Sequence, residues 1–210
     1  VDIVRWRKCG VLRWLVAESF VRLDALAVSD IQITLRLKDV TFLGKSAILS
    51  SMTVGEFLLL AAIEFDDLQT VQWLVEECGA RAAEVRCHGW NVMHVCAHYG
   101  RTEIALWFLS QDAFVPLLHE SCSRKPADKL FAVHLAVQQG FVFLADQFLE
   151  AGCPSQDQNK RSVVWLAEKS KHEVVKEWGK DKAAGKDKPV ALERDIAKIY
   201  DLFEDLSTDM

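Results

Sequence analysis

The sequence has 210 residues, half of them apolar, so it can bury a core as one or two compact domains or as a short repeat array. Its formal net charge of −5 is mild, which argues against a nucleic-acid surface. No apolar run approaches the roughly 18 residues that a membrane helix needs, so neither nucleic acid nor a membrane is expected as a partner. The six cysteines are irregularly spaced and form no C-x-x-C pair. Reduced thiols are therefore expected, in the cytosol or, alternatively, in the nucleus.

Residues 1–50 differ in pattern from the rest of the chain and are predicted to be an N-terminal cap or the end of a preceding domain. Residues 1–20 have the apolar content of a partly buried helix. Within 21–44, the segment 31–37 alternates strictly between apolar and polar side chains, which indicates a β-strand. A lone hairpin is marginal in water, so this region is expected to pack on the later residues.

Between residues 51 and 182 the apolar pattern predicts about four pairs of helices. The units span about 52–85, 86–125, 126–156 and 157–182, and the predicted helices are 56–62 with 68–77, 92–99 with 102–110, 132–139 with 142–150, and 163–169 with 172–178. Asp66 and Asp67 supply N-cap chemistry in the first pair, and Gly100 allows a tight turn in the second. The stretch 113–127 contains Pro116 and Pro126, and it is predicted to be a looser, enlarged connection.

Residues 183–190 are charged and contain Gly and Pro, which predicts a solvated linker before a C-terminal amphipathic helix at 191–206. One narrow apolar stripe runs along this helix at steps of four and three residues, formed by Leu192, Ile196, Ile199, Phe203 and Leu206. The opposite face is acidic. The stripe either folds back over the fourth unit, whose apolar face otherwise ends in water, or pairs with a helix of a partner.

Two stretches carry the same motif 40 residues apart (134 − 94). The first runs from Gly89 through Asn91, Val92, Met93 and His94 to Gly100, and the second contains Val133, His134, Leu135, Ala136 and Gly140. An apolar helix follows each turn glycine, with Glu103, Ile104, Phe108 and Leu109 in the first stretch. These units resemble ankyrin repeats, whose unit of about 33 residues carries T-P-L-H-x-A and two antiparallel helices. No unit here has the Thr-Pro pair, so the helix starts are less fixed than in a consensus array.

The resemblance implies an all-α, ankyrin-like solenoid of antiparallel helix pairs, with a short irregular N-terminal region that is partly β and a C-terminal helix. The equivalent positions of the four units are Leu59, His94, His134 and Trp165. In this family the His at that position lies inside the first helix and hydrogen-bonds backbone between units. His94 and His134 are therefore expected to be structural rather than catalytic.

Ankyrin-like stacks usually bind partners through the concave face and the finger tips. Carried onto this sequence, the resemblance implies partner-binding residues in three units: His88, Trp90, His98 and Tyr99 in the second, Gln138 and Gln139 in the third, and Lys169 in the fourth. Trp and Tyr are favoured anchors of interfaces. For Trp90 an alternative stays open, in which the ring packs against the N-terminal cap or the enlarged connection.

The cluster of Cys87, His88, His94, Cys96 and His98 has the residue types of a zinc site. Zinc needs about four convergent nitrogen or sulfur ligands, and the motif assigns His94 and Cys96 to inward positions, so no metal is expected. No oxyanion element, Gly-rich phosphate loop or spaced carboxylate pair accompanies the cluster. Neither a cofactor nor a catalytic site is therefore expected.

The sequence thus predicts a non-catalytic protein–protein interaction module or scaffold. The alternative is a regulatory or targeting segment of a larger multidomain protein, such as an enzyme whose catalytic part lies outside the chain. Two observations favour the alternative, because the chain begins with Val1 rather than Met and residues 21–44 do not match the later units. Helix pairing with a partner through Leu192, Ile196, Ile199 and Phe203 is compatible with either function.

Overall fold

The computed structural model of the chain describes residues 53–87, 89–122 and 129–185. The helix expected at 1–20, the strand-like stretch at 21–44 and the C-terminal helix at 191–206 lie outside the described residues, as does His88. The four predicted helix pairs fall within these ranges.

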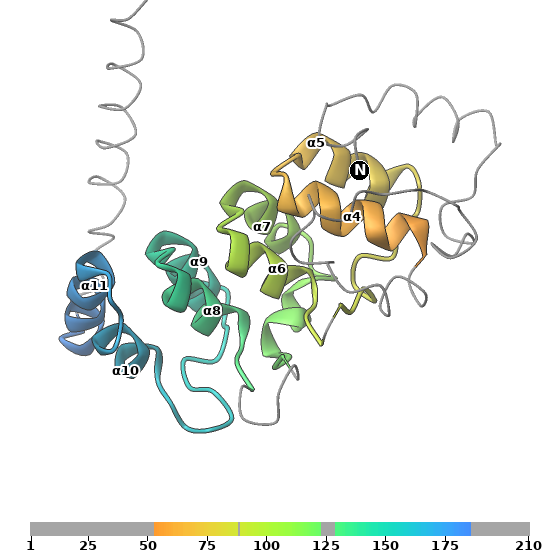
Figure 1. The fold of residues 1–210 in the computed structure, drawn as a ribbon. Coiled ribbons are helices and arrows are strands. Elements are labelled where there is room, and N and C mark those ends of the chain that lie inside the picture. Colours follow the sequence, from red (N-terminus) through yellow and green to blue (C-terminus); the bar gives the residue numbers. More distant parts are fainter. Residues whose placement is uncertain (1–52, 88, 123–128, 186–210) are drawn as a thin grey trace, which may run out of the picture.

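The described residues form four consecutive helix pairs, stacked in chain order from α4 and α5 at one end to α10 and α11 at the other (Figure 1). The elements are α4 (Val54–Glu64), α5 (Leu68–Glu76), α6 (Val92–Tyr99), α7 (Thr102–Leu109), the 3-10 helix η3 (Val115–His119), α8 (Ala132–Gln139), α9 (Val142–Glu150), α10 (Val163–Glu168) and α11 (Glu173–Ala183). No strand of more than one residue occurs among the described residues, and two isolated bridges join Cys87 with Trp90 and Gln156 with Ser162. The predicted all-α architecture of helix pairs is therefore confirmed for this part of the chain.

The first helices of the pairs form an inner row, in which α4 packs on α6, α6 on α8, and α8 on α10. The second helices α5, α7 and α9 touch one another less extensively. One continuous apolar core runs between the rows and includes the fully buried rings of Phe57, Phe108 and Phe148. Each pair therefore buries its apolar side chains mainly against its sequence neighbours, as expected of a stack of repeats.

The helix boundaries follow from local capping chemistry. The side chains of Thr53, Asp67, Asn91 and Ser162 accept hydrogen bonds from backbone N–H groups at the starts of α4, α5, α6 and α10. Gly100 ends α6 in the left-handed region with φ of 67°, which glycine adopts without strain. A Cβ at this position would overlap the ring of Phe141 from the next unit, but this ring is exposed and can turn aside, so the left-handed turn is the main reason for glycine.

The described part of the enlarged connection after α7, residues 113–122, is packed rather than loose, which corrects the expectation there, while residues 123–127 lie outside the described residues. Its residues 115–119 form the helix η3, and Phe114, Leu117 and Leu118 are buried. The Phe114 ring lies 4.7 Å from that of Phe108 on α7, measured between centroids. The insertion therefore extends the core of the stack, because its apolar side chains pack against α7.

Helix α11 is longer than predicted and continues to Ala183 instead of ending at Trp178. Gly179 does not end the helix, because it lies against Ala167 of α10, where a Cβ would overlap the alanine side chain. The buried carboxylate of Asp146 on α9 holds the helix from the other side. Its Oδ1 accepts from Trp178 Nε1 at 2.9 Å and lies 2.9 Å from Lys182 Nζ.

Replacing Asp146 with Ala is expected to lower the free energy of unfolding by about 2 kcal/mol, because the buried Trp178 N–H loses its acceptor and Lys182 loses its ion pair. Urea unfolding of the purified chain measures the difference. The matched control is Glu150→Ala on the same helix, whose exposed carboxylate accepts only from Gln147 Nε2. That control should stay within about 0.5 kcal/mol of the wild type, and equal losses in the two variants would contradict the role of Asp146.

Candidate protein-binding surface

The inner helices α6, α8 and α10 carry exposed side chains at equivalent positions near their C-terminal ends. His98, Gln138 and Lys169 share one position, where His98 is partly exposed and the other two are exposed. Tyr99 and Gln139 follow directly, partly exposed and exposed. Because α6 packs on α8 and α8 on α10, equivalent positions are neighbours across the stack. These five residues are called here the inner-row surface, and they are five of the seven residues that the sequence suggested.

Trp90 lies elsewhere than expected, because its side chain is only 5 % exposed. The expectation that it is accessible is wrong. Two hydrogen bonds of 2.9 Å between the backbones of Cys87 and Trp90 form a tight finger before α6, and this finger turns the indole inward. The ring meets His98 edge-on, with 5.0 Å between centroids. Trp90 is therefore buried, as the packing alternative required, but the ring contact that the structure describes is with His98 rather than with the N-terminal cap or the enlarged connection.

Tyr99 is held on two sides. Its ring lies 4.9 Å from that of His98, in an edge arrangement, and the guanidinium of Arg101 lies 5.8 Å from the centre of the Tyr99 ring. Arg101 also donates to the Glu64 carbonyl and lies 3.7 Å from Asp66 Oδ2. Side chains that are fixed before binding lose less conformational entropy when they are buried in an interface, so this end of the inner-row surface is preorganised.

Trp165 on α10 is an exposed aromatic residue that the sequence reading did not include among the binding residues. Its side chain is 43 % exposed, and Lys169 Nζ lies 6.0 Å from the centre of its ring. The one available signal was that Trp165 replaces the histidine found at the same position in two other units. That substitution gave no indication of exposure, because exposure depends on what lies beyond the fourth unit.

His94 is fully buried and links the start of its own helix to the next unit. The neutral ring carries one proton, and with this proton on Nε2 it donates to the Leu130 carbonyl at 3.2 Å while Nδ1 accepts from the Asn91 N–H at 3.4 Å. With the proton on Nδ1 it would donate instead to Asn91 Oδ1 at 2.7 Å. Burial lowers the pKa of His94 to about 4, against smaller opposing effects of the Leu130 carbonyl and Glu120. The prediction that His94 bonds backbone between units is confirmed.

His134 is the buried counterpart of His94 in the third unit. Burial lowers its pKa, while Asp157 and the carbonyls of Arg161 and Ser155 act in the opposite direction. Asp157 and Arg161 belong to the fourth unit, so the ring of His134 faces the next repeat. Unlike His94, neither ring nitrogen of His134 has a hydrogen-bond partner among the described residues, so the predicted backbone bond is not observed for His134. Both rings are therefore enclosed in the core of the stack and shielded from solvent.

The cysteines of the described residues are free, and four of the five are buried. Burial raises the pKa of the Cys96 and Cys153 thiols, which keeps them protonated and poorly nucleophilic. Within the described ranges, no group of three or more His, Cys, Asp or Glu side chains is arranged to hold a metal ion. His88 of the suggested metal cluster lies outside these ranges.

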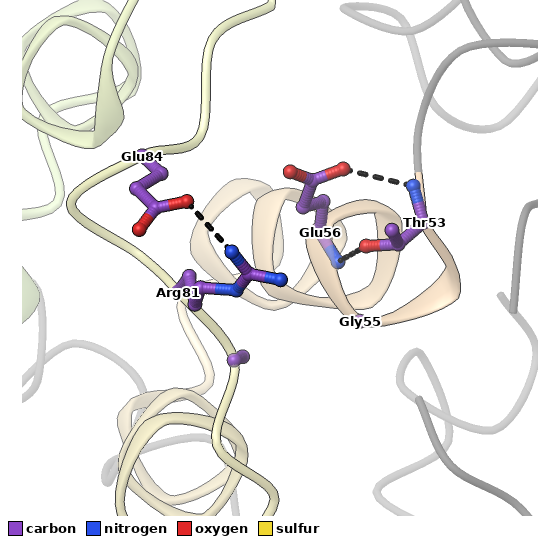
Figure 2. A pocket seen from close by; sticks show the side chains of 6 residues that line it. Thr53, Gly55, Glu56, Arg81 and Glu84 are labelled. Carbon is purple, nitrogen blue, oxygen red and sulfur yellow. Dashed lines mark hydrogen bonds and ion pairs between the residues drawn. The ribbon is translucent and has the colours of Figure 1, made fainter. Parts of the chain in front are cut away.

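A small pocket of about 120 Å³ lies beside the start of α4 (Figure 2). Its polar side chains already have partners within the protein, since Glu56 Oε2 accepts from the Thr53 N–H at 2.8 Å and Arg81 lies 3.1 Å from Glu84. The carboxylate of Glu56 closes the capping box of the helix. The pocket is thus a by-product of helix capping and offers few groups to a ligand.

The sequence was compared with models of known protein families. Residues 59–109, from α4 to the end of α7, match the family model described as ankyrin repeats (many copies). Residues 59–109 are therefore ankyrin repeats. No curated protein matches the chain. Ankyrin repeats generally mediate protein–protein interactions and are generally non-catalytic modules.

The first unit aligns with the second in two ways that differ by one residue. Asp66 and Gly100 are both left-handed, with φ of 60° and 67°, and each precedes the N-cap residue of the second helix, which makes Leu60 the counterpart of His94 (100 − 94 = 66 − 60). Counted from the C-cap residues Gly100 and Phe65, the counterpart is Leu59, as predicted (100 − 94 = 65 − 59). Both leucines are buried, so hydropathy alone did not distinguish them.

In the part of the chain that the structure describes, no helix has the length and apolar character needed to cross a membrane.

Proposed function

We propose that this ankyrin array binds a partner protein through the inner-row surface of His98, Tyr99, Gln138, Gln139 and Lys169. The observation that supports the proposal is that these side chains occupy equivalent positions on three helices packed in succession. Such a row is a continuous strip on one rigid support. The buried cysteines and the buried His94 and His134 lie in the core of the stack and offer no groups to a partner.

The strip changes in chemistry along its length. The α6 end presents an aromatic pair, which is supported by the buried Trp90 and by Arg101. The α8 segment presents two glutamines with amide donors and acceptors. The α10 end presents Lys169, whose ammonium group lies near the exposed Trp165 ring. A partner segment that fits would place an apolar or aromatic side chain at Tyr99 and an acidic one at Lys169.

The test is capture of a partner from native extract by the purified chain. The triple variant Tyr99→Ala, Gln138→Ala, Lys169→Ala removes one side chain from each of the three helices. Capture should fall about tenfold or more, the effect of losing about 1.4 kcal/mol of binding free energy at a few central residues.

The matched control replaces exposed residues of the outer row, Glu103→Ala and Glu150→Ala. This double variant should capture the partner as well as the wild type does. If the folded triple variant retains full capture, the inner-row surface is not the binding site. If both variants lose capture equally, the effect is not specific to the inner row and the proposal fails.

A further inference from the structure

The last helix pair exposes an aromatic residue at a position that the preceding pairs bury. His94, His134 and Trp165 are each three residues after the N-cap residue of their helix, which is Asn91, Phe131 or Ser162. The next unit covers both histidines, which are 0 % exposed, whereas Trp165 is 43 % exposed. Trp165 therefore points to the place where a further unit would lie, and no described residue fills that place.

We propose that this place is filled by the chain's own segment 191–206, whose apolar stripe packs on Trp165 and closes the stack. The terminal units of a repeat array need a cap that buries the apolar face on one side and presents a polar face on the other. Segment 191–206 has both faces, with Leu192, Ile196, Ile199 and Phe203 on one and acidic residues on the other.

The connection is short enough to favour this segment over a separate molecule. Gly179 of α11 lies beside Ala167 of α10, and the antiparallel α11 then runs back along α10 to Ala183, toward the helix start near Trp165. Residues 186–191 join Gly185 to the first stripe residue, Leu192. Six residues span at most about 20 Å. The tether therefore keeps the stripe within reach of Trp165 at a high effective concentration.

The charges also complement each other. Residues 157–185 hold seven Lys and Arg against five Asp and Glu, a net charge of +2, and residues 191–206 hold two against five, a net charge of −3. Lys171 and Lys180 of the last pair are exposed and form no ion pair with any described residue. Opposite net charges favour the docked arrangement and orient the segment, although exposed pairs add little stability individually.

The experiment measures the solvent accessibility of Trp165 in the full chain, by hydroxyl-radical labelling with mass spectrometry. The buried Trp73 and Trp90 serve as internal references. The double variant Ile196→Asn, Phe203→Asn breaks the stripe and should raise the labelling rate of Trp165 several-fold, with no change at the references. The matched control Arg194→Asn, Lys198→Asn places the same residue type on the opposite side of the segment and should leave Trp165 as in the wild type.

Two results would overturn the proposal. In the first, Trp165 of the wild type is labelled as fast as in the stripe variant, so the segment does not cover it. In the second, the protection of Trp165 disappears on dilution, so the cover is a second copy of the chain rather than the tethered segment. Protection that is independent of concentration and lost only in the stripe variant supports docking within one chain. Because this readout needs no partner protein, it stands or falls separately from the proposed binding function.

Discussion

Replacing Asn91 with Ala is expected to lower the free energy of unfolding by about 3 kcal/mol, the sum of a lost helix cap and a buried carbonyl left without its donor. The Asn91 side chain is fully buried. Its Oδ1 accepts from the His94 N–H at 3.1 Å, and its Nδ2 donates to the Leu117 carbonyl at 2.8 Å and to Glu120 Oε2 at 3.2 Å. One amide thus joins the start of α6 to the inserted η3 helix.

Urea unfolding at neutral pH measures this loss. The matched control is Ser162→Ala, because Ser162 is the N-cap residue of α10 and accepts only from the Trp165 N–H, at 3.1 Å. That variant loses a cap without exposing a buried partner, so it should cost about 1 kcal/mol. A loss in Asn91→Ala no larger than in Ser162→Ala would show that the bonds to the insertion contribute nothing to stability.

The stability of the fold is expected to fall as the pH is lowered from about 6.5 toward 4, because His94 and His134 are buried. Burial lowers the pKa of both rings, to about 4 for His94. The unfolded chain therefore binds more protons than the folded chain in this window, so the free energy of unfolding rises with pH there. Each histidine contributes up to about 1.4 kcal/mol per pH unit.

Urea unfolding at several pH values between 7.5 and about 4.5 tests this expectation. The lower limit excludes the titration of Asp157 from the measurement. The pKa of Asp157 is lowered, so its contribution to the free energy of unfolding is lost only below about its ordinary pKa of 3.8. For Asp157, burial raises the pKa, but the hydrogen bonds and charge of Arg161 outweigh this effect. The variant His134→Gln should reduce the slope of stability against pH, and the exposed His172→Gln should leave it unchanged. A wild-type stability that is flat across the window would contradict the titration of buried histidines.

Local signals were sufficient to predict much of the helix content. The predictions 92–99, 132–139 and 142–150 agree with α6, α8 and α9. The first two of these helices end at left-handed glycines, Gly100 and Gly140, and a glycine at such a position stops a helix by its own backbone preference. Predictions were less accurate where the deciding contact is distant in sequence. Helix α11 extends past Gly179 because Asp146 and Ala167 of other helices hold it.

The candidate site was also predicted in part. The ankyrin resemblance located the positions His98, Tyr99, Gln138, Gln139 and Lys169, and the structure places them on one row of packed helices. The resemblance could not show that Trp90 is buried. Its burial depends on the backbone hydrogen bonds between Cys87 and Trp90, which orient the indole toward His98. Nor could it show that the insertion around Pro116 is packed, because this depends on the surface that α7 leaves open.

The sequence by itself determined the repeated helix pairs and their turns, because these depend on capping, glycine conformation and apolar spacing within about 30 to 40 residues. Only the tertiary structure decided which of the variable residues reach solvent. His134 and Trp165 occupy the same place in their helices, yet one is fully buried and the other is 43 % exposed. The physical reason is that exposure depends on the neighbouring unit, which covers His134 and which no described residue supplies for Trp165.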